Sequence, residues 1–162
     1  MDARFVTEAP LWVWPLLAFL IWVGLRATKE REAPVAIYWL MPLFVLLSLN
    51  AMMETARPDV AWPAFAVSYL AGARVGFAYQ ARVVIARTAR RVRVRGEWIT
   101  LATIMAVFCL GYARGALGAV APEFLASPHG AAAVAAISGA LSGQFAGRAL
   151  SVIRWRQGRL EA

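Results

Sequence analysis

The chain of 162 residues has one cysteine, Cys109, and one histidine, His129. A single cysteine cannot form a disulfide within the chain, and one histidine cannot supply both axial ligands of a haem or most of a zinc site. The sequence also lacks a phosphate-binding loop, a metal-binding histidine pair and a serine nucleophile elbow. We therefore expect no enzymatic activity, no metal site and no cofactor.

Charged residues are scarce as well, at 16% of the chain against 61% hydrophobic residues. Globular proteins average about a quarter charged and about half apolar residues, so a soluble core could not absorb this apolar surplus. A helix needs roughly 20 apolar residues to cross a bilayer. Five segments of about that length hold no charge or a single arginine, and they are 9–25, 33–53, 60–81, 98–122 and 129–153.

These segments predict an all-α fold, a single transmembrane domain built as a bundle of five membrane-spanning helices. Pro42 should kink the second helix, because proline lacks a backbone donor and clashes with the preceding turn. Residues 1–8 lack the basic region of a secretory signal, so we expect the first segment to be retained.

Basic residues are distributed unevenly between the connections. Twelve Lys and Arg residues follow the first, third and fifth segments, six of them in the loop 82–97. The alternate connections hold Arg4 and Arg57. Because basic loops remain in the cytoplasm, this pattern predicts a multi-pass inner-membrane protein of bacterial type, with its N-terminus outside and its C-terminus inside.

Within the loop 82–97, valines alternate with arginines from Arg91 to Arg95, which is the period of a short strand. The favoured interpretation is a cytoplasmic loop that rests on anionic lipid headgroups. Nucleic acid is not an expected partner, because no aromatic residues alternate with these arginines and no recognition helix is apparent.

Glycines recur at four-residue spacing in the last three segments. They are Gly72 and Gly76, Gly111 and Gly115, and Gly139, Gly143 and Gly147. Such spacing places small residues on one helix face and lets backbones approach closely. It predicts close packing of these three helices within the chain, and it leaves open a homo-oligomer through the face of Gly139, Gly143 and Gly147.

Each of these three segments contains one arginine, and an arginine inside a span is a candidate functional residue. Arg74 and Arg148 lie at similar depth, and Gln144 is one turn from Arg148. One interpretation is that both side chains extend to the headgroups. The other is that Arg74, Arg148 and Gln144 form a binding site for an anionic headgroup or a small anion.

Arg114 lies toward the opposite end of its segment. Asn50 and Glu54 share a helical face at the end of the second segment, at the same expected depth. We therefore expect a structural polar clasp of Arg114 with Asn50 and Glu54.

A few short patterns resemble a family of small bacterial inner-membrane proteins of unknown function, loosely similar to CcdC-like membrane proteins. The patterns are Leu11-Trp12-Val13-Trp14 with Gly24-Leu25-Arg26, Gly96-Glu97-Trp98 with Phe108 and Tyr112, and the stretch from Leu141 to Leu150. The family often has a basic residue just before the tyrosine, where this chain has Gly111. The resemblance implies a multi-span fold and no known activity.

Three functions remain open at this point. The first is a non-enzymatic scaffold, or a bundle that binds anionic lipid or a small anion. The second is a small transporter with Arg114, Asn50 and Gln144 along its path, although no Asp or Glu lies inside a predicted span to carry protons. The third is an enzyme acting on lipid phosphates, which would need acid or base groups that the sequence does not place together.

Overall fold

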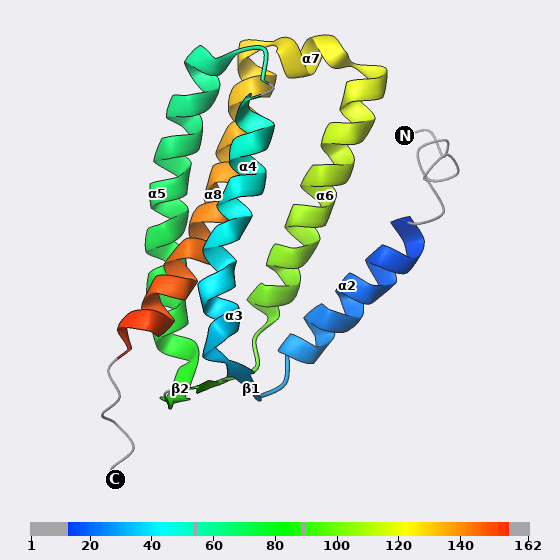
Figure 1. Cartoon of the computed structure of the whole chain (residues 1–162). Coiled ribbons are helices and arrows are strands. Elements are labelled where there is room, and N and C mark those ends of the chain that lie inside the picture. The colour runs from blue at the N-terminus through cyan, green and yellow to red at the C-terminus, as the bar shows by residue number, and fades with distance from the viewer. Residues whose placement is uncertain (1–12, 54, 89, 156–162) are drawn as a thin grey trace.

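The computed structural model describes residues 13–53, 55–88 and 90–155. Most of this part is helical, as expected, and a small sheet closes one end of it (Figure 1). The helices are α2 (Val13–Ala27), α3 (Val35–Leu40), η1 (Met41–Leu43, a 3₁₀ turn), α4 (Phe44–Met53), α5 (Pro58–Val83), α6 (Trp98–Val120), α7 (Pro122–Ala126) and α8 (Pro128–Arg154). The strands are β1 (Arg31–Pro34), β2 (Val84–Arg87) and β3 (Arg91–Val94).

The helices α5 and α8 form the most extensive helix pair among the described elements. Their backbones can approach this closely because glycines lie at the contact. A Cβ atom at Gly72 or Gly76 would overlap the α8 backbone, and one at Gly143 or Gly147 would overlap the α5 backbone. Gly139 is equally close to Phe65 of α5. The face that could have joined two copies of the chain is thus covered by α5 of the same chain. Close packing within the chain is confirmed for these two helices.

The prediction of close packing is wrong for α6. A Cβ atom at Gly111 or Gly115 would meet nothing within 4 Å. The helix that α6 contacts most extensively is α2, whose Gly24 packs against Leu101. Figure 1 shows α2 and α6 on one side of the molecule and α4, α5 and α8 on the other, with α7 joining α6 to α8.

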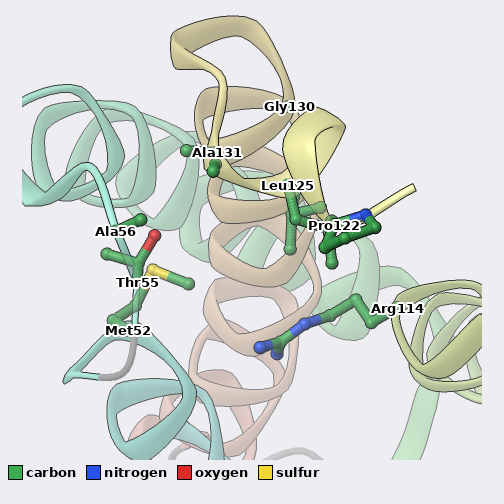
Figure 2. Close-up of a pocket in the computed structure, with 10 residues that line it drawn as sticks. Met52, Thr55, Ala56, Arg114, Pro122, Leu125, Gly130 and Ala131 are labelled. Carbon is green, nitrogen blue, oxygen red and sulfur yellow. The ribbon is translucent and has the colours of Figure 1, made fainter. Parts of the chain in front are cut away.

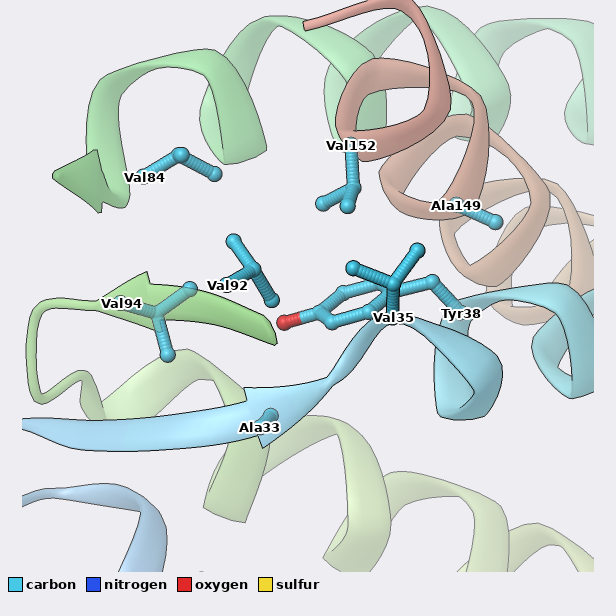
Figure 3. Close-up of a cluster of buried hydrophobic side chains, with 8 residues drawn as sticks. All are labelled: Ala33, Val35, Tyr38, Val84, Val92, Val94, Ala149 and Val152. Atoms are coloured by element: carbon cyan, nitrogen blue, oxygen red, sulfur yellow. The ribbon is translucent and has the colours of Figure 1, made fainter. Parts of the chain in front are cut away.

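The sheet has the order β1-β3-β2 with antiparallel pairing throughout. The alternation expected from the sequence is confirmed in β3, where Val92 and Val94 are buried while Arg91 and Arg93 are exposed. The buried valines meet residues from α3 and α8 in one apolar cluster (Figure 3). Its buried members are Ala33, Val35, Tyr38, Val84, Val92, Val94, Ala149 and Val152.

Prolines set several helix boundaries. Pro42 lies in η1, the 3₁₀ turn between α3 and α4, so the expected interruption at this residue is confirmed. Pro58 and Pro128 begin α5 and α8, where a missing backbone donor removes no helical hydrogen bond. Ser127 caps α8 by accepting a hydrogen bond from the backbone N–H of Gly130 at 3.1 Å.

The prediction of five membrane-spanning helices is wrong. The multi-pass membrane location that was predicted from them is therefore not supported. Among the described residues, α6 is the one helix that is long and apolar enough to cross a membrane. The apolar helices Val13–Ala27 and Val35–Asn50 are too short. The helices α5 and α8 reach 26 and 27 residues, but glycine, polar and charged residues lower their mean hydropathy, and neither is apolar enough to cross a membrane. A long segment with few charges is therefore not always apolar enough to span a membrane.

Candidate functional site

The sheet end of the molecule carries a dense set of exposed basic side chains. They come from the ends of α2, α5 and α8 and from the β2–β3 hairpin, and they are Arg26, Lys29, Arg82, Arg90, Arg91, Arg93, Arg95 and Arg154. Two of them have acidic partners beside β1: Arg91 pairs with Glu32 at 3.1 Å and Arg93 with Glu30 at 2.5 Å. Most of the positive charge at this end thus remains without a counter-ion among the described residues.

Arg87 of β2 has a structural role in the same region. Its Nη1 lies 2.5 Å from the carbonyl oxygen of Val152, 2.7 Å from that of Ile153 and 2.9 Å from that of Trp155. The last carbonyls of a helix have no partner within the helix and carry partial negative charge. Arg87 therefore caps the C-terminus of α8 and connects this end of the helix to the β2–β3 hairpin through hydrogen bonds.

Directly behind the basic surface lies a buried ion pair between Arg148 of α8 and Glu97, the residue before α6. Arg148 is 3% exposed and Glu97 6%, and Nη2 of Arg148 donates to Oε1 of Glu97. Nε of Arg148 donates to Oε1 of Gln80 at 2.8 Å, and Nη1 to Oγ1 of Thr100 at 3.1 Å. The hydroxyl of Thr100 in turn donates to Oε1 of Glu97 at 2.7 Å. This network joins α5, α6 and α8 at their sheet ends.

Two tyrosines border the ion pair. Burial raises the pKa of Tyr38 above its ordinary value of 10.0, and the positive charge of Arg148 opposes that shift. Burial also raises the pKa of Tyr79, and the negative charge of Glu97 adds to the effect. Both hydroxyls thus stay protonated at neutral pH and can act as hydrogen-bond donors beside the pair.

The structure does not bring Arg74, Arg148 and Gln144 together on one surface. Arg74 is exposed on α5, whereas Arg148 is buried and neutralised by Glu97. Gln144 accepts a hydrogen bond from the hydroxyl of Thr103 at 3.4 Å. An external anion cannot reach Arg148 without displacing Glu97, which removes the central residue from the expected anion site.

The structure describes two of the three residues of the expected polar clasp, Arg114 and Asn50. Glu54 lies outside the described residues, so its pairing with Arg114 stays a prediction. Asn50 is exposed, and it forms no hydrogen bond with Arg114 among the described contacts. The Arg114 side chain instead reaches into a pocket beside Thr55 and Pro122 (Figure 2).

Sequence reasoning missed the role of Glu97 and with it Gln80 and Thr100. One signal could have pointed to Glu97: it is the one acidic residue in the loop 82–97, among six arginines. Among the described residues, no group of three or more His, Cys, Asp or Glu is placed to hold a metal ion.

No known protein family matches the chain, and neither does a solved structure. The uncharacterized protein PM0739 of Pasteurella multocida (strain Pm70) is 31% identical over 68 residues, which is 41% of this chain and 53% of that protein. The chain thus spans about half the length of this relative, and the relative's name states no function. The resemblance to CcdC-like membrane proteins stays a prediction.

Proposed function

We propose that this protein is a non-enzymatic, membrane-associated protein that binds anionic lipid headgroups through its basic sheet end. The observation that carries the proposal is the set of exposed arginines there, of which Arg82, Arg90 and Arg95 form no ion pair with any described residue. Each basic residue near an anionic membrane contributes about 1 kcal/mol, so even these three supply a useful affinity.

The exposure of α6 supports the membrane part of the proposal. Its most apolar 18-residue window is 6% buried inside the protein. The core helix of a soluble protein would be mostly covered, and large uncovered apolar surfaces mark contacts with a membrane or a partner. The basic end lies at the start of α6, where a headgroup layer would meet it if α6 enters a bilayer (Figure 1).

The transporter considered above requires several membrane-crossing helices, and it is not proposed for this reason. The anion site expected at Arg74, Arg148 and Gln144 is not proposed either, because Glu97 already neutralises Arg148. The proposed binding surface consists of the exposed arginines of the hairpin instead.

Native mass spectrometry tests this function with the purified protein in non-ionic detergent, titrated with phosphatidylglycerol or phosphatidylcholine. We expect preferential binding of phosphatidylglycerol, reduced several-fold in the double variant Arg90→Gln, Arg95→Gln and weakened by added salt, since exposed charges are screened. The control is Arg57→Gln, a partly exposed arginine at the opposite end that is ion-paired with Asp59. Equal binding of the two lipids, or an equal loss in the control, contradicts the proposal.

A further inference from the structure

A cavity of about 240 Å³ lies at the end of the molecule opposite the sheet. Its walls come from the end of α4, the segment before α5, α7 and the first turns of α8, and they are mainly apolar, with Met52, Leu125 and Val134 among them. Figure 2 shows Arg114 reaching into this space from α6, with Thr55 on the opposite wall. Among the described residues, the pocket is mainly apolar and holds one permanent positive charge, that of Arg114.

A second source of positive potential, the N-terminus of α8, borders the same pocket, and the backbone N–H of Gly130 there is already hydrogen-bonded to Ser127. Gly130 and Ala131, which line it, belong to the first turn of the 27-residue helix α8. The N-terminus of such a helix carries the equivalent of roughly half a positive charge. No described residue that lines the pocket is acidic. Charge and helix dipole together therefore favour an anion, which would compete with Glu54 for Arg114 if the pairing predicted from the sequence forms.

The size and the walls of the pocket restrict what that anion can be. Ligand pockets for drug-sized molecules enclose about 300–1,000 Å³, so this one suits a smaller molecule and cannot enclose a phospholipid. A guanidinium donates two parallel hydrogen bonds to a carboxylate, and the apolar walls can bury a short hydrocarbon chain. We infer that the pocket binds a small monocarboxylate with a short alkyl chain. This site is separate from the proposed lipid-binding end, and either can fail without the other.

Methionine methyl NMR can test the site, using hexanoate as the probe and uncharged hexanamide as its matched control. Met52 is buried in the pocket wall, whereas Met41 and Met105 do not line it, so their signals serve as internal references. We expect hexanoate to shift the Met52 signal in a saturable way and hexanamide to bind more weakly. Removing a charge-assisted hydrogen bond by Arg114→Gln should weaken hexanoate binding by about 10- to 100-fold.

Two further variants separate the charge of Arg114 from a general effect on folding. Arg114→Lys keeps the charge but loses the two parallel hydrogen bonds, so it should weaken hexanoate binding less than Arg114→Gln does. Arg74→Gln, on an exposed face of α5, should change nothing. Unchanged Met41 and Met105 signals confirm that a variant is folded. The inference is overturned if hexanoate gives no saturable shift of Met52, if hexanamide binds equally well to the unaltered protein, or if folded Arg114→Gln binds as tightly as that protein does.

Discussion

Replacing Glu97 by glutamine should destabilise the protein by about 3–5 kcal/mol, because it leaves the Arg148 guanidinium charged and buried without its counter-ion. Arg148 is 3% exposed, so water cannot replace the lost carboxylate. The remaining hydrogen bonds that Arg148 donates are accepted by Gln80 and Thr100, which are neutral and cannot balance the charge. Arg148→Met should cost a similar amount, because it isolates the Glu97 carboxylate instead.

The double variant Glu97→Gln, Arg148→Met removes both charges. Its loss of stability should be far smaller than the losses of the two single variants added together. Replacing a whole buried pair by groups of similar volume is often neutral, whereas removing one member is costly. The exposed pair of Arg91 and Glu32, whose side chains are 70% and 54% exposed, provides the matched control. There Arg91→Gln should cost less than about 1 kcal/mol.

Equilibrium unfolding followed by tryptophan fluorescence measures all four free energies of the cycle in one detergent condition. We expect a coupling energy of at least about 2 kcal/mol between Glu97 and Arg148, in the upper part of the usual range for contacting residues. If the losses of the two single variants simply add, or if Glu97→Gln is as mild as Arg91→Gln, the ion pair does not hold α6 to α8 as described.

Two further predictions concern packing and pH. Gly143→Ala should destabilise the protein by about 1–3 kcal/mol, because the added methyl group would overlap the Tyr69 backbone. Gly111→Ala on α6 should be neutral or slightly stabilising. Thermal unfolding of both variants measures the difference, and equal effects would contradict the packing of α5 on α8. The raised pKa of Tyr38 means that its contribution to stability is complete below pH 10.0 and is lost as pH rises through the higher folded-state value. Tyr38→Phe should therefore flatten the loss of stability at alkaline pH, and an unchanged pH profile would count against burial of this hydroxyl.

Local patterns were enough to predict several parts of the fold. The alternation of valine and arginine predicted the strand that became β3, and the four-residue glycine spacing predicted the contact of α5 with α8. Pro42 marked the interruption between α3 and α4. The strand and the interruption at Pro42 depend on backbone geometry within a few residues, which sequence spacing reveals. The glycine spacing was not sufficient, because the same spacing predicted close packing of α6 that the structure does not show.

The membrane topology and the site depended on information that spacing does not hold. The scarcity of charge in α5 and α8, which hold Arg74 and Arg148, was taken as apolar character, although their glycine residues serve helix packing instead. Glu97 and Arg148 are 51 residues apart, and an arginine that looked available to an outside anion was already paired inside the chain. Only the tertiary arrangement shows which charges compensate each other.

The pairing of β1 with β3 has a consequence for how the chain is made. Residues 31–34 pair only with residues 91–94 in the described sheet, about 60 positions later. At roughly 5–20 residues per second, a ribosome needs about 3–12 s to make the partner strand after β1. During that interval the edge of β1 has no strand to bind, although α3 and α4 have already been made. The nascent chain therefore passes through a period in which the edge of β1 that faces β3 has no strand partner, and this period ends when the β2–β3 hairpin emerges.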